Sequence, residues 1–255
     1  NFLRNKAKIN DFINALELKK GELVIEIGPG KGVITKDLLK KEIKLICIEK
    51  DEKLVKKLSD KFKDEKLEII EGDALEIIPK ITKEISPKPY KLVGNIPYYI
   101  TGKLFRTIEE LTHKPTLSVL GIQKQVAQRV TANPPKMNIL SASVQFWGEP
   151  EIISFIPKSD FDPSPKVDGG IVKIKTKDNI QDSELYFKAV KIIFKHPRKT
   201  LANNLSIEGL DKEKIKNLLE SSGIIPSWRP ENLSIRDIKK ISKLIEKMKL
   251  IRHVV

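Results

Sequence analysis

Histidine and cysteine, which often carry nucleophilic and acid–base chemistry, are scarce in this chain: its 255 residues include three His and one Cys. Cys47 lies in the apolar run 44–48, which is typical of a strand, so we interpret it as a buried core residue in a reducing, cytoplasmic compartment. A thiol buried in a strand is inert, which excludes Cys47 as the nucleophile of a pyrimidine-carbon methylase. His113, His196 and His253 lie away from the strand-end loops described below, so no strong catalytic base is expected.

Long apolar runs and acidic residues are also lacking. No run approaches the roughly 20 residues that span a membrane, and no metal is expected. Only 34 Asp and Glu stand against 48 Lys and Arg, which gives a net charge of +14. Residues 181–255 hold 16 Lys and Arg but nine Asp and Glu, so half of the excess lies in less than a third of the chain. This concentration predicts a polyanionic partner, nucleic acid first and an anionic membrane second, rather than an evenly lysine-rich surface.

Short apolar runs alternate with amphipathic stretches over the first 176 residues. This alternation predicts an α/β fold with a mostly parallel, doubly wound, Rossmann-like sheet. The expected strands are 23–27, 45–48, 67–70, 92–94 and 117–122, with helices over stretches such as 51–62 and 103–111. Two further candidates, 151–156 and 170–174, flank a Pro-rich turn without a long helix between them, so we expect an antiparallel addition at one edge of the sheet.

The pattern changes after Thr176. The polar stretch 177–183 is typical of a linker, and only helical periodicities follow it, at 184–194, 199–205, 212–221 and 234–247. Ser234 with Asp237 resembles a capping box at the start of the last of these helices. We therefore expect a cofactor-binding catalytic domain over 1–178 and a small all-helical domain over 179–255.

A glycine-rich loop, Glu26-Ile-Gly-Pro-Gly-Lys-Gly32, follows the first expected strand. Gly28 and Gly30 allow a tight turn and a close approach of the backbone to a ligand. A dinucleotide fold would place its third glycine one residue later, at Val33, and Pro29 has no N–H to offer a phosphate. The spacing instead favours S-adenosylmethionine, which has no phosphate. A nicotinamide-dependent oxidoreductase on a similar sheet is the alternative.

Polar side chains also follow the next three strands. Glu49 ends the second strand, where a carboxylate can accept hydrogen bonds from both ribose hydroxyls of a cofactor. Asp73 follows the third strand and can accept from the adenine amine, while the backbone N–H of Ala74 can reach a ring nitrogen. Asp73, like Asp51, could instead be a helix cap. With Asn95 at the end of the fourth strand, these residues are expected to converge on one crevice.

The tetrapeptide Asn95-Ile96-Pro97-Tyr98 is the most specific motif in the chain. The Asn95 side chain offers an acceptor, Pro97 drives the preceding residue toward extended geometry that turns its carbonyl outward, and Tyr98 offers a flat face. Two acceptors beside an aromatic ring suit a planar base with an exocyclic amine. The motif is similar to the Asn-x-Pro-Tyr signature of methyltransferases that modify amino groups, although a Pro-containing turn with a buried Tyr is the alternative.

Nearly the whole chain resembles the KsgA-type ribosomal RNA adenine dimethyltransferases, which share a fold with the Erm methylases of large-subunit RNA. The cofactor loop and the Asn95 motif carry this resemblance together with the segments 1–3, 123–129, 161–168, 198–204 and 229–234. The resemblance implies an enzyme that uses S-adenosylmethionine to add two methyls to N6 of each of two adjacent adenosines near the 3′ end of small-subunit RNA, during ribosome biogenesis.

Further site residues are implied by the same resemblance. Cofactor contacts are expected at Asn1, Leu3 and Lys50, in addition to Glu26, Gly28, Gly30, Glu49, Asp73, Ala74 and Asn95. A glutamine that precedes the first of these in the family is outside this chain, and we expect a few residues to precede it. Ile96 stands where Leu is usual in the KsgA type and Ile in Erm, and Gly169 where Ser is common. An Erm-like target and a non-catalytic assembly factor are therefore alternatives.

Recognition of the RNA is expected at two places. Tyr98 and Phe161 should cover the two faces of the target adenine, although Phe161 could be a plain core residue. A row of basic residues in the helical domain has spacings of three and four, which predict one helical face that follows RNA phosphates: Lys188, Lys191, Lys195, Arg198 and Lys199. A solvated surface without function is the alternative. The chain is expected to act as a monomer.

Overall fold

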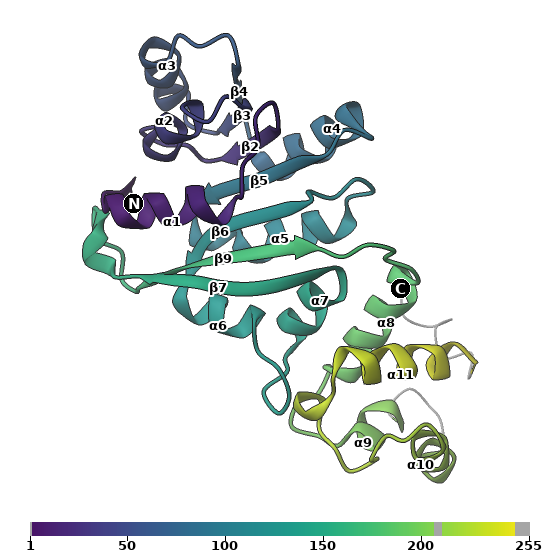
Figure 1. Cartoon of the computed structure of the whole chain (residues 1–255). Coiled ribbons are helices and arrows are strands. Elements are labelled where there is room, and N and C mark those ends of the chain that lie inside the picture. Colours follow the sequence, from purple (N-terminus) through teal and green to yellow (C-terminus); the bar gives the residue numbers. More distant parts are fainter. Residues whose placement is uncertain (1, 207–210, 248–255) are drawn as a thin grey trace. The chain divides into compact units, whose positions relative to one another are not determined.

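The computed structural model describes residues 2–206 and 211–247, which form two compact units (Figure 1). The first unit comprises residues up to 128 together with 148–176, and the second comprises 129–147 together with the chain from 177 onward. Residues 129–147 therefore belong with the C-terminal helices, although they lie far from them in sequence. A division of the chain at one residue near 177 would place 129–147 in the first unit instead.

A seven-stranded sheet forms the centre of the first unit, with the order β4-β3-β2-β5-β6-β9-β7. All seven expected strands are present, and each observed strand end lies within three residues of the end expected from the sequence. They are β2 (Leu23–Ile27), β3 (Lys44–Glu49), β4 (Leu67–Glu71), β5 (Tyr90–Asn95), β6 (Leu117–Gln123), β7 (Gly148–Ile156) and β9 (Gly169–Thr176). Strands β2 to β6 are parallel to one another, so their carboxyl ends share one edge of the sheet.

The antiparallel addition lies at the expected edge. Strand β9 pairs antiparallel with both β6 and β7, and β7 is the outermost strand. The register between β7 and β9 shifts between Ile152 and Ser154, as at a β-bulge, which locally increases the twist of the edge. A connection without a long helix suffices here because antiparallel neighbours need no crossover.

Helices cover the sheet on both faces, with α1 (Lys6–Ala15) in front and α5 (Thr101–Glu110) behind in Figure 1. The other helices associated with the sheet are α2 (Val33–Leu39), α3 (Glu52–Lys61), α4 (Ala74–Ile85) and α6 (Lys124–Val130). Asp51 and Asp73 cap the helices that follow β3 and β4. Buried apolar side chains such as Phe12, Leu16 and Val24 join α1 to the sheet in one core.

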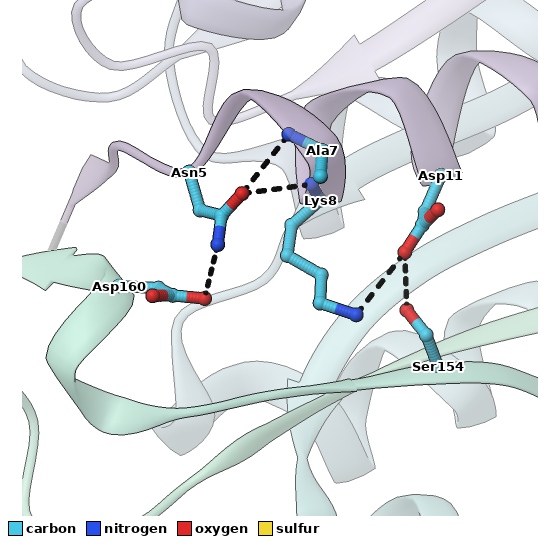
Figure 2. A network of polar contacts seen from close by, with 6 residues as sticks. All are labelled: Asn5, Ala7, Lys8, Asp11, Ser154 and Asp160. Carbon is cyan, nitrogen blue, oxygen red and sulfur yellow. Dashed lines mark hydrogen bonds and ion pairs between the residues drawn. The ribbon is translucent and has the colours of Figure 1, made fainter.

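A second sheet, of two short strands, ties the start of the chain to the Pro-rich segment after β7. In it, β1 (Phe2–Leu3) pairs antiparallel with β8 (Phe161–Asp162). The Asn5 side chain caps α1 through the N–H groups of Ala7 and Lys8, and it also donates to Asp160 Oδ2 at 2.8 Å (Figure 2).

Nearly two turns further along α1, a carboxylate makes a second tie. Asp11 accepts from Lys8 Nζ at 3.3 Å and from Ser154 Oγ at 2.6 Å (Figure 2). Segments more than 140 residues apart in sequence are thus held together at two points along α1.

The second unit is helical as expected. Its helices are α7 (Ile139–Trp147), α8 (Ser183–Ile193), α9 (Leu201–Ser206), α10 (Lys212–Ser221) and α11 (Ile235–Lys247). The Tyr186 ring stacks on Phe146 with centroids 4.0 Å apart, and its hydroxyl donates to the Ala142 carbonyl at 3.0 Å, which fixes α8 on α7. Ser234 and Asp237 make the predicted reciprocal capping bonds. Among the described helices of both units, none has the length and apolar character that crossing a membrane requires.

Candidate active site

The carboxyl ends of β2, β3 and β5 enclose a cavity of about 180 Å³. Parallel pairing brings these ends together, because Glu26 on β2 is opposite Cys47 on β3 and Val93 on β5. The cavity is lined by Phe2, Leu3, Glu26, Gly28, Pro29, Gly30, Val33, Ile34, Glu49, Leu54, Asn95 and Pro97. Six of these residues were predicted from the sequence as cofactor contacts, and the structure brings all six together.

Three N–H groups of the glycine loop donate hydrogen bonds within the protein. Gly28 N donates to the Ile48 carbonyl at 2.9 Å, Gly30 N to Glu49 Oε2 at 3.0 Å and Gly32 N to the Pro29 carbonyl at 2.9 Å. Phosphate-binding loops instead direct such N–H groups at the ligand. A carboxylate already occupies the centre of this loop, so the loop is unsuited to a pyrophosphate. The dinucleotide alternative therefore finds no support in the geometry.

Gly30 also needs to be glycine for a steric reason. Its φ is +59°, in the left-handed region, and a Cβ would lie 2.8 Å from the Phe2 ring. Phe2 thus packs directly on the loop, and the ammonium of Lys31 lies 4.5 Å from the Phe2 ring centroid. The start of the chain is thereby part of the cavity wall.

Glu49 has a structural role that the sequence did not indicate. Its carboxylate accepts from three backbone N–H groups, those of Gly30, Lys50 and Asp51, at 2.9–3.1 Å. The side chain is buried yet lines the cavity. Because a carboxylate has about four acceptor positions, Glu49 can hold the loop and still accept a ligand hydroxyl.

Glu26 is the most buried acid at the site, with 1% of its surface exposed. Thr35 Oγ1 donates to its carboxylate at 2.7 Å, and Cys47 Sγ lies 3.4 Å from the same oxygen. Burial raises the pKa of Glu26 to about 7, and it raises the pKa of the Cys47 thiol too. A carboxyl that titrates near neutrality in a cavity wall would be ionised by an ammonium group of a ligand.

Asp73 and its neighbours lie next to this cavity but do not line it. Asp73 Oδ1 accepts from Leu75 N at 3.0 Å, which makes Asp73 the cap of α4, and Oδ2 accepts from Lys50 Nζ at 3.0 Å. The backbone bond to Leu75 and then the Lys50 ammonium lower the pKa of Asp73. Ala74 is buried at the first position of α4. The helix-cap interpretation of Asp73 is thus confirmed, and its acceptor role toward a ligand stays a prediction.

The Asn95 motif lies where β5 ends, beside the cavity. Asn95 closes the strand, and Ile96 N donates to the Gly121 carbonyl on β6 at 2.8 Å. Gly121 is needed there because a Cβ would lie 2.8 Å from Asn95 Oδ1. Tyr98 is half-buried, and its hydroxyl is buried without a hydrogen-bond partner among the described residues. Burial, with the charge of Asp168 as a smaller cause, raises the pKa of Tyr98.

Phe161 is buried more deeply than a stacking residue requires. Only 5% of its surface is exposed, and it belongs to the same core as Leu3, Phe12 and Ile156. Its strand β8 pairs Phe161 with Leu3, so Phe161 supports the segment that closes the cofactor cavity. The structure therefore favours a core role for this ring.

The row of basic residues in the second unit does not form one helical face. Lys188 and Lys191 lie on α8, but this helix ends at Ile193. The prediction of a shared face is wrong for Lys195, Arg198 and Lys199, which lie in the following turn. The physical reasons are Pro197, which cannot continue a helix, and the Asn204 amide, which bonds both the N–H and the carbonyl of His196.

Sequence reasoning missed several residues of the cavity wall. Those not predicted are Phe2, Pro29, Val33, Ile34 and Leu54, whereas Pro97 was expected at the base site as part of the Asn95 motif. The signal for two of them was available, since Val33 and Ile34 open the helix after the glycine loop and such a first turn faces the ligand. Asn1, predicted as a cofactor contact, and His253 lie outside the described residues.

Comparison with known proteins shows the family to which the chain belongs. The family model for ribosomal RNA adenine dimethylases matches residues 1–247. The chain is 38% identical over 247 residues to the ribosomal RNA small subunit methyltransferase A of Dehalococcoides mccartyi strain BAV1, covering 94% of this chain and 84% of that protein. It is 35% identical to the protein of the same name from Mycoplasma mycoides, covering 96% and 95%.

Solved structures show the same architecture. A dimethyladenosine transferase from Plasmodium falciparum superposes with a TM-score of 0.83 at 25% identity, over 98% of each chain. The 23S rRNA methyltransferase ErmE shares the fold with a TM-score of 0.78, over 96% of this chain and all of that one. The chain belongs to the ribosomal RNA adenine dimethylase family.

Proposed function

We propose that this protein transfers methyl groups from S-adenosylmethionine to N6 of two adjacent adenosines near the 3′ end of small-subunit ribosomal RNA. The observation that carries the proposal is the place of the Asn95 motif at the end of β5, beside a cavity that contains two buried carboxylates, Glu26 and Glu49. The names of the relatives support the choice of RNA and subunit.

The residues present fit S-adenosylmethionine by the chemistry of their donors and acceptors. Glu26 would pair with the ammonium of its methionine portion, Glu49 would accept from the ribose, and Asp73 with the Ala74 N–H would recognise the adenine. The glycine-loop N–H groups are bonded within the protein, which suits a ligand without phosphates. When bound, this cofactor supplies a methyl group on a sulfonium. Lys50 would act through Asp73, to which it donates.

The protein's part in the chemistry is to orient the target amine. The lone pair of an adenine N6 is delocalised into the ring, so the amine is a weak nucleophile. Acceptors at the Asn95 side chain and the Ile96 carbonyl would bond its two hydrogens and favour a tetrahedral nitrogen. Holding the amine in this orientation lowers the free-energy barrier of methyl transfer, because less freedom of motion remains to be lost in the transition state. No strong base is needed, since the proton becomes acidic only as the new N–C bond forms.

Recognition of the RNA is divided between the two units in this proposal. Tyr98 stacks on the target base. Phe161 contacts the base only through the small part of its ring that is exposed, and its main role is to pack against the strand that contains Leu3. The five basic residues of the second unit, from Lys188 to Lys199, contact phosphates. The protein acts as a monomer in the cytoplasm, on the immature small subunit.

Single-turnover methylation of small-subunit particles tests the proposal. Wild type should place four methyls on two adjacent adenosines, located by mass spectrometry of RNA fragments. Asn95→Ala should lower the rate of transfer far more than the affinity for cofactor or RNA, because its bond matters most as the amine becomes tetrahedral. Methylation of large-subunit RNA instead, or tight particle binding without any transfer, would overturn the assignment.

A further inference from the structure

We propose that a hollow at the end of β6 binds the nucleotide next to the target adenosine in the RNA strand. The hollow has a volume of about 350 Å³ and is lined by Gln123, Lys124, Gln125, Lys158, Lys166, Val167 and Asp168. That volume falls in the range of small-molecule pockets, roughly 300–1,000 Å³. This inference rests on the proposed function, since it names a second subsite of the same RNA-binding site.

The hollow lies one strand away from the catalytic motif. Asn95 at the end of β5 is opposite Gly121 on β6, and Gln123 is two residues further along the same strand. Neighbouring strands lie about 5 Å apart, which a nucleotide and its neighbour can bridge. Asp168, in the wall of the hollow, contributes to the raised pKa of Tyr98, so the hollow lies within electrostatic range of the Asn95 motif.

The charges of the hollow favour a phosphate. Three ammonium groups, those of Lys124, Lys158 and Lys166, face one carboxylate, that of Asp168. This carboxylate is engaged by the protein: Oδ1 accepts from Lys158 N at 3.1 Å and Oδ2 pairs with Lys124 Nζ at 3.6 Å. Its role is to hold the two walls of the hollow together, while the excess of positive charge remains available to the RNA backbone.

Three features suit the base of that nucleotide. The side-chain amides of Gln123 and Gln125 make no hydrogen bond within residues 2–206 and 211–247, and a glutamine amide can donate to and accept from the edge of an adenine. Val167 is 44% exposed and offers an apolar contact. Next to the hollow, the Phe155 ring is 39% exposed with Lys124 Nζ 5.1 Å from its centroid, a cation–π arrangement found at single-strand binding sites.

The occupant follows from the substrate. Since the two target adenosines are adjacent, one must wait close by while the other is in the catalytic slot. A hollow with amide groups for an adenine edge and lysines for its phosphate would hold the waiting adenosine. It would then set which adenosine reacts first and keep the RNA bound between the two rounds.

The test uses the full protein and a short hairpin RNA that carries the two adjacent adenosines, in an intact form and in forms with one adenosine replaced by an abasic nucleotide. A double variant, Gln125→Ala with Lys166→Gln, removes one amide and one ammonium group from the hollow. The control variant Lys80→Gln, Lys83→Gln changes two exposed lysines on α4, away from it. RNA affinity is measured by fluorescence anisotropy, and methylated products by mass spectrometry.

The hollow variant should bind the intact hairpin about tenfold more weakly and lose the order in which the two adenosines react. On the hairpin whose waiting adenosine is abasic, the same variant should lose much less affinity, because the base contact is already absent. The control should behave as wild type on every RNA.

An equal loss of affinity on intact and abasic hairpins would overturn the proposal, since the hollow would then hold backbone only. So would an unchanged affinity and order. A wild type that methylates neither adenosine in small-subunit particles would instead refute the proposed function.

Discussion

The buried Glu26 carboxyl should make the stability of the ligand-free protein fall as pH rises toward neutrality. Its pKa is raised from 4.5 to about 7, chiefly by burial. The folded protein therefore binds this proton more tightly than the unfolded chain does. Below pH 4.5 the stabilisation is complete, because Glu26 is protonated in both states. It is lost progressively between 4.5 and 7, where the unfolded chain ionises freely and the folded protein must either keep the proton or bury a charge.

The size of the effect follows from the shift. Each pKa unit corresponds to about 1.4 kcal/mol, so a rise from 4.5 to about 7 predicts a loss of roughly 3 kcal/mol in the free energy of unfolding. The bonds from Thr35 and Cys47 are already included in this balance, since both lower the pKa against the larger effect of burial.

Urea unfolding of wild type and Glu26→Gln at a series of pH values measures the effect. The variant is neutral at every pH and keeps an acceptor for Thr35, so the other titrating groups cancel in the difference. Wild type minus variant should decline by about 3 kcal/mol from pH 4.5 to 7 and stay level above 7. A difference that is flat over this range, or that grows with pH, would refute the burial argument. With S-adenosylmethionine present the decline should shrink, since its ammonium would favour the ionised carboxylate.

Three further outcomes are expected. Glu49→Gln should weaken cofactor binding by roughly 1.5–3 kcal/mol in calorimetry, and Glu49→Ala should also lower thermal stability because it frees three backbone N–H groups; equal cofactor affinity in wild type and both variants would rule out the ribose assignment. Tyr98→Phe should keep methyl transfer and stability, because the hydroxyl it removes is buried without a described partner, whereas Tyr98→Ala should reduce transfer because the ring no longer stacks on the base; a large defect in Tyr98→Phe would show that the hydroxyl acts on the substrate. Neutralising Lys195, Arg198 and Lys199 together should lower the salt dependence of RNA binding by roughly 0.7–0.9 log units of slope for each phosphate that is no longer neutralised, with cofactor affinity unchanged; an unaltered slope would leave these residues without a phosphate role.

The sheet could be predicted from the sequence because its strands are local signals. Each is a short apolar run between polar segments, and parallel order then places Glu26, Glu49 and Asn95 at one edge without further information. The helix caps at Asp51, Asp73 and Ser234 are equally local, since a cap bonds N–H groups two or three residues away. Apolar runs and the polar residues that follow them were therefore enough to predict where the site lies.

What the sequence could not give depends on contacts between distant segments. The pairing of β1 with β8 involves two residues from each strand and joins Leu3 to Phe161, which no periodicity reveals. The extra role of Glu49 arises only when the glycine loop folds over it. The end of α8 was predicted to within one residue, so the expectation that Lys195, Arg198 and Lys199 continue its face was avoidable, because Pro197 is visible in the sequence and a helix seldom continues to the residue before a proline.

These distant contacts form one connected series of residues that runs from the cavity to β8. Glu49 holds Gly30, Gly30 packs against Phe2, and the next residue, Leu3, pairs with Phe161. Each link is a backbone bond or a close steric contact, so the links shift together rather than singly. If the cavity holds the methyl donor as proposed, we expect the alignment of donor and amine to depend on the first residues of the described chain as well as on Asn95. For the same reason, we expect the Asn5–Asp160 bond, which ties α1 to the segment before β8, to help position both ligands although neither residue lines the cavity.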